Sequence, residues 1–299
     1  MNLKTLRSNL LLTLTALIWG SAFVAQSVGM DFIGPFTFNS VRSFIGALAL
    51  VPVIFLFKNK EKTQSGTKKD LYLGGVICGV VLAVSSSLQQ IGISMGTTAG
   101  KAGFITALYI VIVPFLNVFF GKKVTLKAWA AALIAIVGMY LLCINGGFNI
   151  AKSDFIVFLC AVCFSVHITV VDIFSPKVDG IKMSCIQFLV SGIVNFVPML
   201  IFEHPQITPI LMAWKPLLYA GILSSGVGYT LQIVAQKDTT PVAASLIMSL
   251  ESVFALLTGW LVLGNVLSGR ELLGCLLVLV GIILSQLPSL KKPSLCKNN

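Results

Sequence analysis

Two apolar stretches of the chain each hold a charged side chain where a charge is costly. Glu251 lies within TTPVAASLIMSLESVF (residues 239–254), and Lys101 lies within TTAGKAGFITALYIVIVP (residues 97–114). An ionised carboxylate among apolar residues must meet a water-filled cavity, a cation or a partner, or else hold a proton. Glu251 is therefore a candidate counter-ion for a cationic substrate, a proton carrier or a member of a structural ion pair.

Lys101, Arg42 and His167 can also carry a charge within an apolar segment, and each has a functional and a structural explanation. Lys101 is near one end of its apolar stretch, so its long stem can carry the ammonium group to the interface, or it can attract an anionic group at an outer mouth. Arg42 lies deeper in its segment, as an outward-reaching or structural charge. His167, whose side chain titrates in the physiological range, is either a packing residue or part of a pathway.

Aromatic side chains accompany these charges. Trp19 and Phe23 share one apolar stretch with Gln26, and Tyr109 takes the place in its stretch that Glu251 takes in another. Aromatic faces beside a carboxylate attract an ammonium group. The alternative is ordinary apolar lining.

The elements that position these residues are predicted to be membrane helices. Hydrophobic residues make up 57% of the 299, charged residues only 10%, and the mean hydropathy is +0.96. A soluble chain carries about a quarter charged residues, so most of this surface must face lipid. Ten apolar segments have the length of a helix that crosses a bilayer: 9–28, 35–57, 71–91, 98–120, 125–144, 154–175, 183–202, 214–235, 240–263 and 270–288.

Lysine and arginine predict the orientation of these segments. With a cytoplasmic N-terminus, the inner loops and termini hold 16 of these residues and the outer loops hold 3. Both termini are therefore expected in the cytoplasm of a multi-pass inner (cytoplasmic) membrane protein. The net charge of +11 then faces anionic lipid, and no nucleic-acid partner is needed.

The sequence repeats itself. A shift of 142 residues places Gly79 on Gly221, and the pair Thr97–Thr98 on Thr239–Thr240. The chain is thus predicted to be two five-helix units, residues 1–145 and 146–299. Because five is odd, the second unit enters the membrane from the opposite side. Inverted repeats of this kind are typical of alternating-access secondary transporters.

Within the repeat, a stripe of small residues ends in a glutamine. Steps of four, three and four keep each stripe on one helical face, either for close packing or as pathway lining. The two stripes are Gly79, Ala83, Ser86 and Gln90, and Gly221, Ser225, Gly228 and Gln232.

Taken in order, several motifs resemble the EamA-type permeases of the drug/metabolite transporter superfamily. They are ALIWGSAFV, FNSVRSFIGAL, TTAGKAGFITALY with its later VP, SLESVFALLTGWLVLG and LLGCLLVLVGIIL. The resemblance implies a ten-helix carrier whose central cavity is lined mainly by the first, third, fourth, sixth, eighth and ninth segments. The family's glutamate after the glycine that closes the fourth and ninth segments is replaced here by Lys122 and Asn265.

The expected function is therefore an alternating-access permease that moves a small organic metabolite, such as an amino acid or a quaternary amine or drug. A channel or lipid flippase is the alternative, and an intramembrane enzyme is disfavoured by the absence of catalytic and nucleotide-binding motifs. Neither a cofactor nor a metal is expected, whereas protons or another coupling ion, and a monomer or a homodimer, stay open. The cavity candidates are Trp19, Phe23, Gln26, Ser86, Gln90, Phe104, Tyr109, His167, Tyr229, Gln232 and Glu251; Arg42 and Lys101 are outer-mouth or structural charges.

Overall fold

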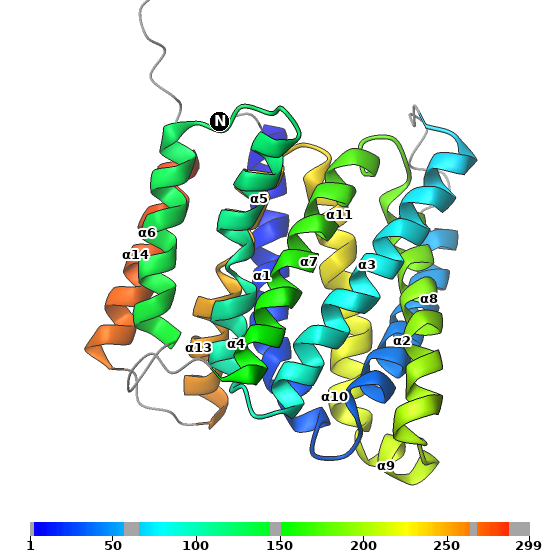
Figure 1. The fold of residues 1–299 in the computed structure, drawn as a ribbon. Helices are drawn as coiled ribbons and strands as arrows, with labels where there is room; N and C mark the ends of the chain where they lie inside the picture. Colours follow the sequence, from blue (N-terminus) through cyan, green and yellow to red (C-terminus); the bar gives the residue numbers. More distant parts are fainter. Residues whose placement is uncertain (1–2, 57–65, 144–150, 264–267, 287–299) are drawn as a thin grey trace, which may run out of the picture.

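The computed structural model describes residues 3–56, 66–143, 151–263 and 268–286, and these residues form helices and short links without a strand (Figure 1). The all-helical class predicted from the sequence is confirmed. The predicted unit boundary at 145 and 146, and Asn265, lie outside the described residues. The helices are α1 (Leu3–Gly29), α2 (Pro35–Leu56), α3 (Lys68–Ser94), α4 (Ala99–Thr106), α5 (Tyr109–Phe119), α6 (Leu126–Cys143), α7 (Lys152–Phe174), α8 (Gly180–Pro198), α9 (Ile207–Met212), α10 (Trp214–Leu218), α11 (Thr230–Gln236), α12 (Pro241–Met248), α13 (Glu251–Leu263) and α14 (Gly269–Gln286), with π-helical η1 (Met199–Glu203) and η2 (Tyr219–Tyr229).

Eight helical spans in the described part of the chain are long and apolar enough to cross a membrane. Helices also occupy the fifth and tenth predicted segments, α6 and α14, which pack along each other at one edge of the bundle (Figure 1). Both run up to residues outside the described ranges, so the count of ten membrane spans stays a prediction.

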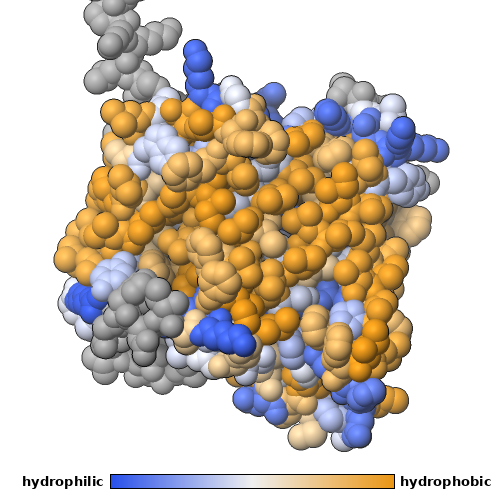
Figure 2. Space-filling view, viewed as in Figure 1, coloured by the Kyte–Doolittle hydropathy of each residue, from blue (hydrophilic) through white to orange (hydrophobic). Residues whose placement is uncertain are grey.

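The outer surface of the bundle is a broad apolar band. In Figure 2, hydrophobic residues cover the middle of the visible face, and hydrophilic residues gather toward its two ends. Large side chains such as Leu48, Leu133 and Ile283 point outward on this surface. A surface of this kind faces lipid, so the chain is a multi-pass membrane protein.

The repeated Thr-Thr pair has a structural role in both places where it occurs. The side chain of Thr98 accepts a hydrogen bond from the backbone N–H of Lys101 at the start of α4, and Thr240 accepts one from Ala243 at the start of α12. Threonine side chains in this position satisfy N–H groups that have no partner inside the helix. The repeat thus marks where two equivalent helices begin.

Neither the fourth nor the ninth predicted segment is one continuous helix. The fourth segment is broken between α4 and α5, and the ninth between α12 and α13. At the first break, Leu108 N–H donates to Ile105 C=O; at the second, Leu250 N–H donates to Ile247 C=O. Both are the tight three-residue turns that often mark a hinge in a helix. The breaks are separated by the same 142-residue offset as the Thr-Thr pairs.

Part of the eighth predicted segment is a π-helix, which is wider than an α-helix and here unusually long. Residues Tyr219–Tyr229 form the π-helix η2, and such helices are rare and are often found at functional sites. Two side chains of α1 donate hydrogen bonds to its carbonyl groups: Thr15 Oγ1 to Gly228 at 3.2 Å and Trp19 Nε1 to Ser224 at 3.4 Å. These bonds fix α1 to η2 beside the centre of the bundle.

Candidate functional site

Side chains from eight helices enclose a small cavity inside the bundle, which we name the central cavity. Its free volume is about 30 Å³, roughly the space of one water molecule. It lies between α1, α2, α3, the break between α4 and α5, α7, η2 and the start of α13. Its lining residues are Trp19, Ala22, Phe23, Gln26, Arg42, Gln89, Thr106, Tyr109, Phe164, Ser224, Tyr229 and Glu251.

A hydrogen bond between Tyr109 and Glu251 joins the two broken helices at this cavity. Tyr109 is the first residue of α5 and Glu251 is the first residue of α13. The Tyr109 hydroxyl donates to Glu251 Oε1 at 3.0 Å, and both side chains are buried. The carboxylate stands at the N-terminal end of a half-helix, where the helix dipole favours negative charge. The sequence predicted that these two residues hold equivalent places, and the structure brings them into contact.

α1 approaches the Glu251 backbone unusually closely. A Cβ atom added at Gly20 would lie 2.5 Å from the Glu251 carbonyl oxygen and 2.8 Å from the Ala255 nitrogen. Only a glycine leaves room for backbone at this distance. Gly20 therefore sets the distance between α1 and the start of α13.

An aromatic cluster contributes Trp19 and Tyr229 to the wall of the central cavity. The rings of Trp19 and Tyr229 lie 4.4 Å apart, and Phe188 meets Tyr229 edge-on at 5.4 Å. His167 also meets Tyr229 edge-on at 5.8 Å, and its Nε2 lies 3.1 Å from Gln187 Oε1. His167 thus stands behind Tyr229 and is not among the residues that line the cavity.

Of the cavity candidates predicted from the sequence, six line the central cavity: Trp19, Phe23, Gln26, Tyr109, Tyr229 and Glu251. Arg42, predicted as an outer or structural charge, also lines it.

The other predicted candidates are buried in helix contacts. Gln90 Nε2 donates to the Gln26 carbonyl group, and Gln232 Nε2 donates to Gln236. Ser86 bonds the backbone of its own helix, and Phe104 packs against Tyr140. The small-residue stripe of α3 is a packing face, since a Cβ added at Gly79 would meet the Gln187 backbone at 2.7 Å.

Sequence reasoning missed five residues that line the cavity. Gln89 is the neighbour of the predicted Gln90 and points to a different side of α3, where its amide donates to Thr106. The periodic stripe selected Gln90 instead of Gln89, and the structure shows that this stripe is a packing face. The missed residues are Ala22, Gln89, Thr106, Phe164 and Ser224.

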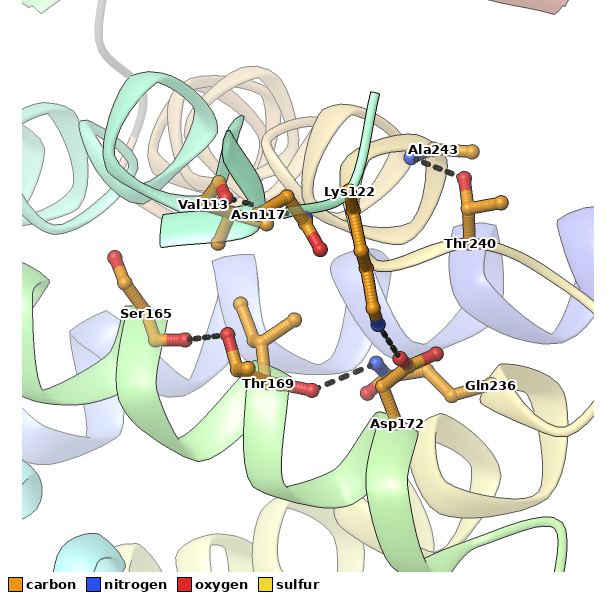
Figure 3. A network of polar contacts seen from close by, with 10 residues as sticks. Val113, Asn117, Lys122, Ser165, Thr169, Asp172, Gln236, Thr240 and Ala243 are labelled. Atoms are coloured by element: carbon orange, nitrogen blue, oxygen red, sulfur yellow. Dashed lines mark hydrogen bonds and ion pairs between the residues drawn. The ribbon is translucent and has the colours of Figure 1, made fainter. Parts of the chain in front are cut away.

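A larger hollow opens at the end of the bundle where α1 begins, and we name it the vestibule. Its free volume is about 370 Å³. Within it, Lys122 forms an ion pair with Asp172 at 2.8 Å (Figure 3). Its lining residues are Asn117, Lys122, Lys123, Val124, Thr125, Ala128, Asp172, Thr239, Thr240, Pro241, Val242, Ala243, Leu246 and Ser285.

At the opposite end, an ion pair ties α4 to α7. Lys101 Nζ lies 2.5 Å from Asp154 Oδ2, and Thr97 Oγ1 donates to the other oxygen of the same carboxylate. The Asp154 side chain is 5% exposed and that of Lys101 is 28% exposed. Lys101 therefore has a structural partner at this end of its segment, and no pattern in the sequence indicated that Asp154 would supply it.

These features define a class: a multi-pass helical membrane protein with buried polar and charged groups at broken helices around its centre. The chain belongs to the EamA-like transporter family, whose profile matches residues 6–144 and again residues 151–287. It is therefore a membrane transporter, as the resemblance implied.

Relatives along nearly the whole length have transporter names. The chain is 30% identical to an uncharacterized transporter of Archaeoglobus fulgidus, over 95% of this chain and 87% of the relative. It is 25% identical to a probable terminal-alkyne amino-acid exporter of Streptantibioticus cattleyicolor, over 91% of each chain. It is 20% identical to the uncharacterized inner membrane transporter YedA of Escherichia coli, over 90% of this chain and 87% of the relative.

A solved crystal structure has the same fold. The TM-score is 0.75 at 17% identity, and the superposition covers 93% of this chain and 95% of the other. At this identity the likeness concerns the fold alone.

Proposed function

We propose that the protein is a secondary transporter that moves a small organic metabolite by alternating access around the central cavity. The observation that carries the proposal is the Tyr109–Glu251 hydrogen bond, which joins two helices broken at equivalent places. Discontinuous helices that meet at the midplane are the usual binding sites of secondary transporters. Each break gives its helix a place to bend while the other half stays packed.

The two ends of the bundle support the same mechanism. The vestibule opens at one end, whereas the Lys101–Asp154 pair ties α4 to α7 at the other. The α4–α5 and α12–α13 pairs run in opposite directions through the bundle (Figure 1). We infer two inverted five-helix units, with the vestibule on the cytoplasmic side. A rocking motion of one unit against the other then exposes the cavity to each side in turn.

The substrate class includes amino acids and quaternary amines. The cavity contains a buried carboxylate, Glu251, and aromatic rings from Trp19 and Tyr229. A relative named as a probable amino-acid exporter supports the first class. Glu251 serves either as the counter-ion of an ammonium group or as a proton carrier.

Counterflow in proteoliposomes tests the proposal. Ligands are first found as compounds that raise the melting temperature of the purified protein, since binding to the native state stabilises it. Each ligand is then loaded inside vesicles, and uptake of its labelled form is followed from outside. A carrier gives saturable uptake with transient accumulation, and Glu251→Gln should abolish it. Flux that neither saturates nor shows counterflow would instead indicate a channel.

A further inference from the structure

Two opposite charges line the central cavity without being paired to each other. Arg42 enters from α2 and is 5% exposed, and Glu251 enters from the start of α13 and is 3% exposed. Among the described residues, no ion pair joins them. The Arg42 guanidinium group lies over the ring of Phe38, whose centroid is 5.7 Å away.

Each of these groups retains hydrogen-bonding capacity toward the cavity. A guanidinium group has five N–H donors in a planar fork that matches a carboxylate. The Glu251 carboxylate accepts from Tyr109 at Oε1, and an ionised carboxylate has about four acceptor positions. Gln26 adds a further acceptor, because its buried Oε1 has no hydrogen-bond partner and its side chain lines the same cavity.

We propose that the solute bound in the central cavity is a zwitterion of the amino-acid type, with its carboxylate on Arg42 and its ammonium group on Glu251 and Gln26. This inference rests on the proposed function and specifies its substrate. A zwitterion matches both buried charges at once. A solute with a single charge leaves one of them unmatched, which is costly at this depth.

A primary ammonium group fits this site better than a quaternary one. It has three N–H donors, and both Glu251 and Gln26 offer oxygen atoms to accept them. A quaternary ammonium group has no donor and would leave the Gln26 oxygen unsatisfied. The rings of Trp19, Phe23 and Phe164 remain for the rest of the solute.

The free volume of about 30 Å³ is smaller than any amino acid. The cavity must therefore widen to admit one, and the breaks beside Tyr109 and Glu251 lie at its wall. Binding is consequently measured on the protein in solution, where it can open.

The test uses matched sets of three probes. Each set contains one L-amino acid, its primary amide, which has no carboxylate, and its N-acetyl derivative, which has no ammonium group. The sets cover small, aliphatic and aromatic amino acids. Glycine betaine is tested as a further probe. The melting temperature of the purified protein should rise with at least one amino acid. The amide and the N-acetyl derivative of that amino acid should bind about tenfold more weakly or worse, the loss expected for one charge-assisted contact, and glycine betaine should also bind more weakly.

Two variants assign the ends of the solute. Arg42→Gln should remove the preference for the amino acid over its amide and keep the preference over the N-acetyl derivative. Glu251→Gln should remove the preference for the amino acid over its N-acetyl derivative and keep the preference over the amide. Arg42→Lys, which keeps the charge, should restore part of the preference over the amide. Matched controls are Arg270→Gln and Asp31→Asn, both at exposed positions, which should bind all probes as the original protein does.

The pattern of preference separates binding from a structural role. A variant that only loses stability weakens all probes equally, and this outcome for both variants would overturn the assignment. If neither variant folds, the three-probe comparison on the unaltered protein decides the matter. The proposal fails if no amino acid raises the melting temperature, or if an amide or N-acetyl derivative binds as tightly as its amino acid. Saturable counterflow of a solute with one charge would refute the zwitterion proposal and leave the transporter proposal standing. Binding of an amino acid without counterflow would support the zwitterion proposal and refute the transporter proposal.

Discussion

At the residue scale, the bond between Tyr109 and Glu251 is where the two matched halves of the chain meet. Each residue begins the second part of a broken helix, and the two differ in chemistry: one donates a hydrogen bond and the other accepts it. A pair of identical residues at these places would give two carboxylates that repel each other or two hydroxyl groups with little charge. The difference makes one polar centre from two equivalent positions.

Tyr109→Phe tests this bond. The substitution keeps the ring and leaves Glu251 Oε1 buried without its donor, so we expect the free energy of unfolding to fall by about 1–3 kcal/mol. Thermal unfolding in one detergent measures the change. Tyr72→Phe is the matched control, because Tyr72 is 60% exposed on α3 and an exposed substitution changes stability by about 0.5 kcal/mol or less. Equal effects of the two substitutions would contradict a stabilising role for the bond.

The sequence predicted this pair and four more residues that line the cavity, but not the rest of the lining. The 142-residue offset was enough to match Tyr109 with Glu251, since a repeat carries positions from one copy to the other. Arg42 is predicted as an outer-mouth or structural charge, because its depth along a helix does not say which way the side chain points, and the structure places it at the cavity. Gln89 and Phe164 lack any periodic signal, and only the packing of α3 and α7 on their neighbours places them at the cavity.

At the scale of elements, α1 and α13 approach each other closely beside the cavity. Gly20 lets these two helices pack backbone to backbone. The distance between them positions Trp19, one residue earlier on α1, beside Tyr229. A change at Gly20 therefore acts on the cavity through the spacing of helices.

Gly20→Ala should be strongly destabilising. The added methyl group would lie 2.5 Å from the Glu251 carbonyl oxygen, and overpacking of this kind costs about 1–3 kcal/mol. Gly100→Ala is the matched control, because no heavy atom lies within 4 Å of the added Cβ and alanine favours a helix by about 0.5–1 kcal/mol over glycine. Melting temperatures should move in opposite directions, and a tolerated Gly20→Ala would show that α1 and α13 are not held at this distance.

The elements were predicted better than their interruptions. Hydropathy located the helical segments, because length and apolar content are what a membrane span requires. The breaks after Thr106 and Met248 lie inside apolar runs that contain no glycine or proline at the turn itself. They follow from the packing of each half-helix on different neighbours, which hydropathy does not record.

At the scale of the whole molecule, the first described residues of α1 and the last of α14 lie at the same end of the bundle (Figure 1). The starts of α3, α6, α8 and α12 lie at this end as well. The excess of lysine and arginine in the corresponding loops predicts, as the sequence did, that this end faces the cytoplasm.

Reporter tags at both ends of the chain test this orientation. A protease or an impermeant reagent added to intact cells should reach neither tag, and both should react after the membrane is made permeable. A control tag inserted at the α9–α10 link, next to Ala213, should react in intact cells. If one terminal tag reacts in intact cells, the even number of crossings is wrong; if both do, the orientation is reversed.

Among the ion pairs of the described residues, none corresponds to Lys101–Asp154 in the other half of the chain. Under the 142-residue offset, the place of Lys101 is taken by Ala243, which carries no charge. Ala243 lines the vestibule, which is the hollow end of the bundle. At the opposite end, the Lys101–Asp154 ion pair ties α4 to α7. In the alternating-access mechanism proposed above, an ion pair at one end only makes the two orientations unequal in free energy. Under that mechanism, the unloaded protein is mostly open to one side of the membrane, and solute on that side meets the binding-competent orientation already populated.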